Sequence, residues 1–402
     1  MAHLPRPRLA IHFERFGPYH KARLTSAREQ LAPIGWHAIG LETASTDAVY
    51  QWQLESHADQ AGIQTVFPGQ AVESLSRKQI HQSIGQTLSQ LNPAAVAIAG
   101  WASADAMACL AWCRNHSKPA LLMSETRAAD GRRLWFKEVL KSWRIKRFQG
   151  ALVGGASHAA YLRSLGFAGP VVTGYNVVDN AYFLAESTQW RANDLQVGLV
   201  SRPYLLASNR FVERKNLGAL LDAFSQVSTS IDLACPLDLC LLGDGEQQGL
   251  LQQACRDHNL PWLQAAPWEA ETPHECSPLC RVLFPGFRQI EELPRFYAHA
   301  MAFVHPALSE PWGLVINEAM AAGLPILSSS NVGAAEELLE EGVNGFFFDP
   351  DGAHSIAAVL QRFLALNHEE QQAMGQASAR LLAERCPTSA FGEGLASLLD
   401  DR

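Results

Sequence analysis

Residues 308–350 decide the fold of this chain, and the first part reads Leu308-Ser-Glu-Pro-Trp-Gly-Leu-Val-Ile-Asn-Glu-Ala-Met-Ala-Ala-Gly-Leu-Pro325. Two glutamates, Glu310 and Glu318, stand eight positions apart around a Trp-Gly pair. An apolar run with helical spacing follows and stops at Gly323-Leu-Pro325, which is typical of a helix end. A short strand is expected at 325–328. The stretch therefore predicts a loop, a helix and a strand, with one acid in the loop and one on the helix.

The start of the predicted helix has a chemistry of its own. The amides near Gly313 and Leu314 have no intrahelical partner, and the helix dipole places partial positive charge there. Such a helix end attracts phosphate, whereas carboxylates accept hydrogen bonds from sugar or ribose hydroxyls. The pattern predicts recognition of a nucleotide diphosphate sugar.

Composition sets the scale of the molecule. At 402 residues, with 48% hydrophobic and 18% charged residues, the chain can bury the cores of two ordinary domains. Its 8 cysteines are scattered, which indicates reduced thiols rather than a disulfide framework. Residues 1–200 hold 20 Lys/Arg and 14 Asp/Glu, and residues 201–402 hold 12 and 26. A basic half joined to an acidic half suggests different partners for each.

Strand-like and helix-like stretches alternate along both halves of the chain. The first half contains apolar runs at 9–13, 95–99 and 120–123, and the second half begins the alternation again at 204–208. Such alternation predicts an α/β fold with parallel, doubly wound sheets. We expect an N-terminal domain over 1–183, a C-terminal domain over 184–384 and a tail helix within 385–402.

The 308–350 stretch resembles the retaining glycosyltransferases of family 4. That family has a Glu, seven residues and a second Glu within Glu-x-(Phe/Trp)-Gly-Leu-Val-x-x-Glu-Ala-Met, and here the string runs from Glu310 to Met320. The resemblance implies the GT-B architecture, in which two doubly wound Rossmann-like domains face each other across a cleft. It also implies that the tail helix packs back on the N-terminal domain.

The resemblance assigns the donor side. Family members have an Arg and a Lys, five positions apart, that ligate the diphosphate, and Arg210 and Lys215 match that spacing; Arg214 is the alternative to Lys215. Glu318 would ligate the ribose. Glu310 would contact the donor sugar, either positioning it or acting as a nucleophile, and we favour positioning, with front-face attack and retention.

Three further residues belong to the donor side by the same resemblance. Gly243, in a Gly-Asp-Gly turn after an apolar strand, is similar to the family's turn near the nucleotide. Phe287 and Arg288 follow another strand, where relatives line the base. The sequence leaves the base open.

The first domain carries the acceptor-side candidates. Gly17, Tyr19 and His20 lie where the family has a glycine-rich loop, but this chain has a single glycine there, which puts backbone cradling of phosphate in doubt. Relatives also have a His that touches the sugar; here the matching stretch contains Ser124 and Glu125 instead. Tyr19 and His20 would contact the acceptor or could equally be structural, and Ser124 or Glu125 would replace the missing His.

A basic stretch over 132–147 holds seven Lys/Arg against one acid. Arg133, Lys137, Lys141 and Arg144 fall on one helical stripe, beside Phe136, Leu140 and Trp143. Such a helix suits an anionic membrane surface or a phosphorylated acceptor. The alternative is a solvated face whose aromatic residues pack into the core.

These features lead to one expected function and two alternatives. We expect a hexosyltransferase-type enzyme that moves a sugar to a lipid-linked or glycan acceptor, in cell-surface polysaccharide or glycolipid synthesis. The alternatives are a nucleotide-sugar epimerase or hydrolase and a non-catalytic sugar-binding scaffold.

Cofactor, location and partners follow from what the sequence lacks. No cofactor beyond the nucleotide sugar and no metal are expected, since His274, Cys276 and Cys280 lack a fourth ligand. No apolar run of 18 residues and no signal peptide core are present, so we expect a cytoplasmic protein, peripheral at the inner membrane face if the basic helix binds lipid. Nucleic acid is not an expected partner.

Overall fold

The structure is a computed structural model that describes residues 6–46, 62–131, 133–196, 202–230, 236–270 and 280–400. It divides into two compact units, one formed by Met1–Val178 with Cys386–Arg402 and the other by Asp179–Arg385. The expected boundary after residue 183 falls inside helix α6 (Asn180–Gln196), which belongs to unit 2. His274 and Cys276, together with Arg132 of the basic stretch, lie outside the described residues.

Unit 1 is built on a seven-stranded parallel sheet with the order β3-β2-β1-β4-β5-β6-β7. Its strands are β1 (Arg8–Phe13), β2 (His37–Thr46), β3 (Ile63–Ala71), β4 (Ala95–Ala99), β5 (Ala120–Ser124), β6 (Gly150–Val153) and β7 (Val171–Thr173). Its helices are α1 (Pro18–Leu31), α2 (Arg77–Leu91), α3 (Ala104–Asn115), α4 (Trp135–Ile145), α5 (Ala156–Ser164) and α14 (Ala390–Asp400). The reversal of strand order at β1 and β4 is the switch point of a doubly wound fold.

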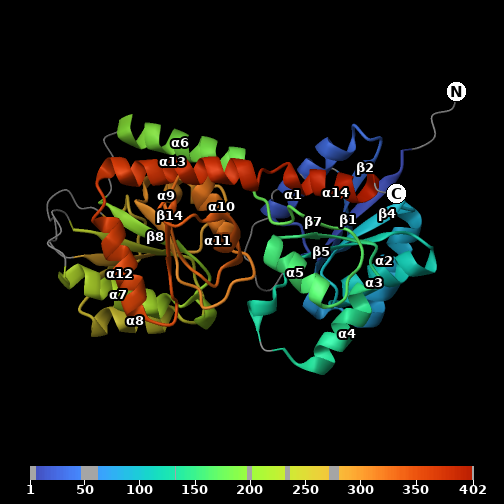
Figure 1. Ribbon diagram of the computed structural model, residues 1–402, viewed down its shortest axis with the longest axis horizontal. Helices are drawn as coiled ribbons and strands as arrows, with labels where there is room; N and C mark the ends of the chain where they lie inside the picture. Colours follow the sequence, from blue (N-terminus) through green and yellow to red (C-terminus); the bar gives the residue numbers. More distant parts are fainter. Residues whose placement is uncertain are drawn as a thin grey trace. The chain divides into compact units, whose positions relative to one another are not determined.

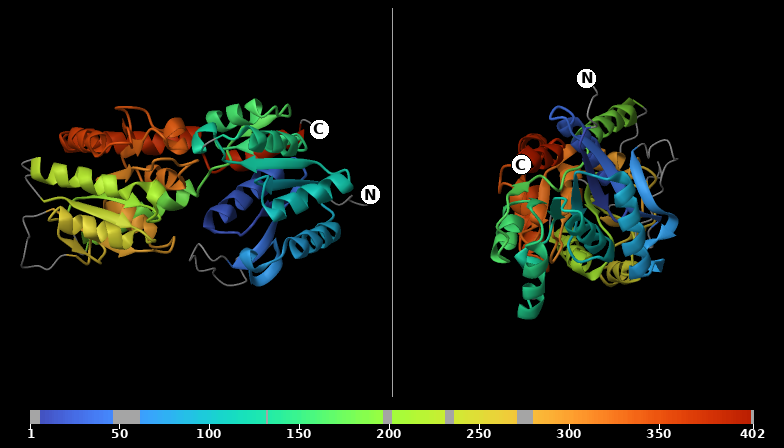
Figure 2. Two further views of the ribbon diagram at one scale, coloured as in Figure 1. Left: turned by 90° about the horizontal axis from the view of Figure 1, so that it is seen from below. Right: turned by 90° about the vertical axis from the view of Figure 1, so that its right-hand side faces the viewer.

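The sequence explains why these strands lie in the middle of unit 1. Strands β4, β5 and β6 are short, almost continuous runs of apolar residues whose side chains are buried, as expected for strands covered on both faces. The register is parallel throughout, with Leu9 opposite Ala38 on one side and Ala95 on the other. Helices therefore cover both faces of the sheet, as Figures 1 and 2 show.

Helix α14, the last of the chain, packs in unit 1 beside α1 (Figure 1). The two helices approach closely because Gly392 has no side chain at the crossing, where a Cβ would clash with the carbonyl oxygen of Ser26. The Ser26 hydroxyl accepts a hydrogen bond from the Gly392 amide at 3.0 Å and donates one to the Ser389 carbonyl at 3.3 Å. The end of the chain is therefore part of the first unit.

Unit 2 has a second seven-stranded parallel sheet, with the order β10-β11-β9-β8-β12-β13-β14. Its strands are β8 (Tyr204–Ser208), β9 (Asp238–Leu242), β10 (Trp262–Leu263), β11 (Arg281–Gly286), β12 (Ala302–His305), β13 (Ile326–Ser329) and β14 (Gly345–Phe348). Besides α6, its helices are α7 (Leu217–Ser230), α8 (Gln248–Asp257), α9 (Leu293–His299), α10 (Leu314–Ala321), α11 (Gly333–Leu338), α12 (Ala353–Leu364) and α13 (His368–Arg385). The loop, helix and strand expected over 308–328 are present as the turn before α10, α10 itself and β13.

Candidate functional site

The donor-side candidates of unit 2 gather where parallel strands of its sheet end. Arg210 and Lys215 follow β8, Gly243 follows β9, and Glu310 follows β12; β8 lies between β9 and β12 in the sheet. The carboxyl ends of neighbouring parallel strands share one edge, which is where open α/β sheets bind ligands. Residues that are far apart in sequence thus meet at one edge.

The loop that carries Glu310 is fixed by backbone hydrogen bonds. The Glu310 amide donates to the Asn331 carbonyl at 3.2 Å, and the Glu310 carbonyl accepts from the Gly333 amide at 3.1 Å. A Cβ on Gly333 would clash with the Pro311 carbonyl, so the two loops fit only with glycine there. The Leu308 amide donates to the Arg214 carbonyl at 2.9 Å, which ties this loop to the one after β8.

Lys215 forms an ion pair with Glu310. Its ammonium donates to Oε2 of Glu310, and the Arg214 guanidinium lies 3.8 Å from the same oxygen. The Lys215 side chain is largely buried, whereas Arg210 is exposed. Burial lowers the pKa of the Lys215 ammonium, the Glu310 carboxylate opposes this shift, and Arg214 and Arg210 add to it. Lys215 and Arg214 thus face one carboxylate, and Arg210 lies near enough to Lys215 to affect its pKa; this excess positive charge suits a dianionic ligand.

The Gly-Asp-Gly turn packs directly against the loop after β8. A Cβ on Gly243 would clash with the Asn209 carbonyl, and Gly243 has a φ of 131°, which favours glycine. The Phe211 amide donates to the Asp244 carbonyl at 2.6 Å, and the Gly243 amide donates to the Gly286 carbonyl at 3.1 Å. The turn therefore holds the Arg210 loop against the ends of β9 and β11.

Helix α10 begins at Leu314, after Gly313 in the left-handed region with a φ of 99°. Gly313 and Leu314 are half-buried, and their amides lie in the first turn, which has no intrahelical acceptors. Trp312 is buried behind this turn, where its indole Nε1 donates to the Asn317 side chain at 2.9 Å. This buried bond sets the direction in which the helix begins.

Glu318 lies deeper than a residue on a ligand-facing surface. Its side chain is fully buried on α10, and the Tyr297 hydroxyl donates to its Oε2 at 2.7 Å. Tyr297, on α9, is also fully buried. In this arrangement Glu318 joins α9 to α10.

Phe287 and Arg288 follow β11 at the same sheet edge, and both are half-buried. Arg288 is held by Glu292 at 2.9 Å and by the Pro285 carbonyl at 3.3 Å. Its guanidinium therefore lies along its own loop.

Two buried polar side chains at this edge were missed by the sequence reasoning. His305, the last residue of β12, is fully buried, and within the described residues neither of its ring nitrogens has a hydrogen-bond partner. Asn209, directly after β8, is also buried with both side-chain amide atoms unpartnered among the described residues. Unsatisfied buried polar groups are costly, so two on neighbouring strands point to a polar ligand. Both residues come at the end of a largely apolar strand, and this position is the feature of the sequence that could have identified them.

His305 is also close to the charged group. Both His305 and Glu310 lie beside Gly313. A Cβ on Gly313 would be 3.5 Å from Nε2 of His305 and 3.3 Å from Cγ of Glu310. Burial holds the pKa of the His305 ring well below its usual range, and the Lys215 and Arg214 cations lower it further. The ring is therefore neutral and has one donor and one acceptor nitrogen.

In unit 1, Gly17, Tyr19 and His20 lie at the start of α1. Gly17 is the N-cap, and its amide donates to Nδ1 of His20 at 3.1 Å. Burial, and after it the nearby Arg23 cation, lowers the pKa of His20 to about 3. The Phe13 ring lies tilted against the His20 ring, with the two centroids 4.2 Å apart. His20 is thus a neutral side chain that caps its own helix.

Ser124 and Glu125 lie at the end of β5. The Ser124 hydroxyl is buried and accepts from the Thr126 amide at 3.3 Å, whereas Glu125 is exposed. Burial raises the pKa of the Tyr175 phenol to about 12; Arg23 opposes this shift and Glu125 adds to it. Since Arg23 also influences His20, His20 and Glu125 belong to one electrostatic neighbourhood within unit 1.

The four basic candidates on and beside α4 have different surroundings. Arg133 donates to the Tyr161 hydroxyl at 2.8 Å and Lys141 donates to it at 2.9 Å, while Lys141 also pairs with Glu138 at 2.7 Å. Lys137 is exposed and Arg144 is half-buried. Arg133 and Lys141 thus attach α4 to α5, and Lys137 and Arg144 lie outside that attachment.

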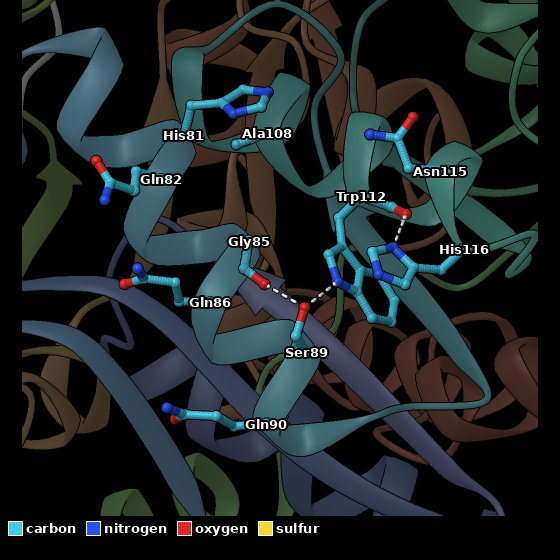
Figure 3. Close-up of a pocket in the computed structure, with 10 residues that line it drawn as sticks. All are labelled: His81, Gln82, Gly85, Gln86, Ser89, Gln90, Ala108, Trp112, Asn115 and His116. Atoms are coloured by element: carbon cyan, nitrogen blue, oxygen red, sulfur yellow. Dashed lines mark hydrogen bonds between the residues drawn. The ribbon is translucent and has the colours of Figure 1, made fainter.

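A surface pocket of about 680 Å³ lies between α2 and α3 of unit 1 and contains none of these candidates (Figure 3). Its polar groups bond to one another: Trp112 Nε1 donates to the Ser89 hydroxyl at 2.9 Å, and Ser89 donates to the Gly85 carbonyl at 2.8 Å. These bonds join the two helices.

The described residues contain neither a candidate membrane span nor a candidate metal cluster. None of the helices there combines the length and apolarity needed to cross a bilayer. No group of three His, Cys, Asp or Glu side chains in the described part of the chain is arranged as metal ligands.

Residues 274–381 match the model of the family described as Glycosyl transferases group 1. A stretch of 85 residues is 40% identical to an uncharacterized glycosyltransferase of Methanocaldococcus jannaschii and covers 21% of this chain and 22% of that protein. A stretch of 188 residues is 29% identical to O-antigen chain mannosyltransferase B of Escherichia coli and covers 46% of this chain and 44% of the relative. The matches thus span less than half the length of either relative.

Structural comparison covers the whole chain. The Anabaena protein HepE, in complex with UDP and glucose, matches with a TM-score of 0.72 at 17% identity over 98% of this chain and 100% of HepE. At this identity the likeness shows the fold. The chain therefore has the GT-B fold, and its residues 274–381 match the family model of the group 1 glycosyl transferases.

Proposed function

We propose that this protein is a retaining glycosyltransferase of family 4 that moves a hexose from a nucleotide-diphosphate sugar to a glycan or lipid-linked acceptor. The observation that carries the proposal is a group of three cations at the carboxyl edge of the unit 2 sheet: Lys215 and Arg214 lie beside Glu310, and Arg210 lies near Lys215. The group 1 family match and the similarity to O-antigen chain mannosyltransferase B support a role in cell-surface polysaccharide or glycolipid synthesis. We place this activity in the cytoplasm.

The proposed reaction uses the cations to stabilise the leaving diphosphate. The bond between the sugar C1 and the diphosphate oxygen breaks, the acceptor oxygen bonds to C1 on the same face, and the acceptor proton passes to the leaving oxygen. Arg210 and Lys215 donate to that diphosphate, which on general grounds contributes about 3–4 kcal/mol per donor in the transition state. Glu310 positions the sugar through its hydroxyls, and the first turn of α10, after Gly313, faces the phosphates.

Other candidates complete the proposal. Glu318 is proposed to contact the ribose; it is buried in the structure, so this contact requires the side chain to become accessible. Gly243, Phe287 and Arg288 are proposed near the nucleotide. The acceptor candidates in unit 1 are Gly17, Tyr19, His20, Ser124 and Glu125. Because the chain's own cations neutralise the diphosphate, we propose that no metal cofactor is needed.

The first test is thermal stabilisation of the purified protein by UDP, GDP and ADP, with UDP placed first because HepE binds it. A nucleotide at 100 times its dissociation constant should add about 2.7 kcal/mol to the free energy of unfolding. Arg210→Ala should abolish the shift, while Arg256→Ala, an exposed change on α8 of the same unit, should preserve it.

Turnover completes this test. The nucleotide sugar chosen by the shift should be consumed when an acceptor is present, and consumption should persist in EDTA. Consumption that needs no acceptor would favour the hydrolase or epimerase, and loss of all turnover in EDTA would contradict the metal-free proposal. No shift with any nucleotide would favour the scaffold.

A further inference from the structure

Helix α4 exposes an unusual set of large apolar side chains. Those with at least two fifths of their surface exposed are Trp135 (79%), Phe136 (53%), Val139 (61%), Leu140 (46%) and Trp143 (56%), and Leu134 (43%) directly before the helix adds to them. Ile145 is the one residue of α4 whose side chain is buried. Since contiguous exposed apolar surface on a folded protein marks an interaction site, this face requires a partner.

Basic side chains lie around this apolar face. Lys137 is exposed on the same helix, and Arg144, the residue before its last, is half-buried. Just beyond the helix, the Arg147 guanidinium lies 3.1 Å from the centroid of the Trp143 ring. The single acid of the helix, Glu138, is occupied by Lys141 and by the Tyr161 hydroxyl. Helix α4 therefore offers Lys137, Arg144 and Arg147 no further carboxylate with which to pair.

The helix is attached to unit 1 on its opposite side. Arg133 and Lys141 hold α4 against Tyr161 of α5 through hydrogen bonds and through cation–π contacts of 4.3 and 5.5 Å. Figures 1 and 2 show α4 at the periphery of unit 1, projecting beyond the other helices of that unit. These contacts hold α4 in place, so its apolar face is exposed on an ordered helix.

We propose that this face, the α4 surface formed by Trp135, Phe136, Lys137, Val139, Leu140, Trp143, Arg144 and Arg147, docks on an anionic lipid bilayer. Helices that lie in a bilayer interface bury Trp, Phe and Leu at the boundary with the acyl chains while Lys and Arg contact anionic headgroups. A second copy of the chain is a poorer occupant, because it would place like charges of two α4 surfaces together. This inference does not depend on glycosyl transfer.

The experiment is cosedimentation of the full chain with vesicles of phosphatidylcholine alone and of phosphatidylcholine with phosphatidylglycerol. Binding should occur on the anionic vesicles and weaken in 0.5 M salt, about the concentration at which charges on the protein and the bilayer are strongly screened. Inorganic phosphate at millimolar concentration should leave it unchanged, which separates a lipid surface from a site for free phosphate.

Two variants and their controls test the named residues. Trp135→Ser with Val139→Ser should weaken vesicle binding by roughly tenfold or more through lost apolar burial. Lys137→Glu should weaken it by about fivefold or more, since each basic residue near an anionic surface contributes roughly that factor. The controls are Leu195→Ser, at a 70% exposed apolar residue of α6, and Lys78→Glu, at an exposed residue of α2; both should bind as the wild type does.

Each other outcome overturns the proposal. Equal binding to neutral vesicles would show that anionic lipid is not what is recognised. Binding that neither α4 variant changes would show that another surface of the protein binds the vesicles. Absence of vesicle binding together with a dimer that the Trp135/Val139 variant dissolves makes a second copy the occupant. All substitutions are at exposed positions, so unchanged melting temperatures will show that any lost binding is local.

Discussion

The Lys215–Glu310 ion pair must be replaced by contacts with the ligand when the donor binds. In the structure Lys215 is neutralised by Glu310, whereas the proposed reaction uses Lys215 for the diphosphate and Glu310 for the sugar. The pair therefore has to separate, or share its charges, as the donor enters. The sequence spacing suggested both residues, but their contact across 95 positions arises from the neighbouring ends of β8 and β12.

Glu310→Gln should separate binding from turnover. Removing this carboxylate frees Lys215 for the diphosphate and removes a repulsive charge, so a nucleoside diphosphate should bind about fivefold more tightly, which corresponds to roughly 1 kcal/mol. Transfer should fall at least a hundredfold if Glu310 positions the sugar. Calorimetric titration and an initial-rate assay measure the two quantities; Glu369→Gln, on the exposed first turn of α13, is the control. Weaker diphosphate binding in Glu310→Gln would show that the pair holds Lys215 in place for its ligand.

His305 should make stability depend on pH. Its ring stays neutral in the folded protein at a pH where an unfolded His, with the ordinary pKa of 6.5, takes up a proton. The unfolded state then binds more protons, so the free energy of unfolding falls as the pH drops below 6.5, by up to about 1.4 kcal/mol per pH unit for one ring.

Urea unfolding at pH 7.5 and 5.5 measures this loss. His305→Gln should remove roughly 1 kcal/mol of the wild-type difference between the two pH values. His37→Gln, at an exposed residue where β2 begins, should leave the difference unchanged. Identical differences in wild type and His305→Gln would mean that His305 is protonated in the folded state.

At the scale of elements, the crossing of α1 and α14 is set by Gly392. A glycine within a helix normally costs stability relative to alanine, but here a Cβ would meet the backbone of Ser26. Gly392→Ala should therefore destabilise unit 1 by about 1–3 kcal/mol, as overpacking does. Gly85→Ala on α2, where a Cβ meets nothing within 4 Å, should be neutral or stabilising by about 0.5–1 kcal/mol. Chemical denaturation compares the two, and equal effects would show that the helices can move apart.

The elements themselves were largely predictable, and the reasons are local. The short apolar runs of β4, β5 and β8 and the stop at Gly323 fixed the alternation of strand and helix. The environment of individual side chains could not be predicted from the sequence. Arg133 and Lys141 lie on the same predicted stripe as Lys137, but Tyr161, 20 or more positions away, accepts their hydrogen bonds. The burial of Glu318 likewise depends on Tyr297 of another helix.

For the whole molecule, each unit contains its own sheet and core, and the donor-side residues all belong to unit 2. A chain that stops after Arg385 lacks α14, whose buried residues include Phe391, Leu395 and Leu398. In that chain α1, β6 and β7 lose their cover, so unit 1 should unfold or aggregate while unit 2 keeps its nucleotide-dependent thermal shift. Limited proteolysis followed by mass spectrometry locates the unfolded part. A protease-resistant unit 1 would show that α14 is dispensable.

The place of α14 also has a consequence for synthesis on the ribosome. Unit 2 is encoded without interruption between residues 179 and 385, so all of its strands and helices are available before the last helix emerges. The greater part of unit 1 leaves the ribosome before unit 2, whereas its helix α14 leaves after unit 2. The nascent first unit must therefore wait, with the surface beside α1 uncovered, while more than two hundred further residues are translated. During that interval it is the part of the protein most in need of a chaperone.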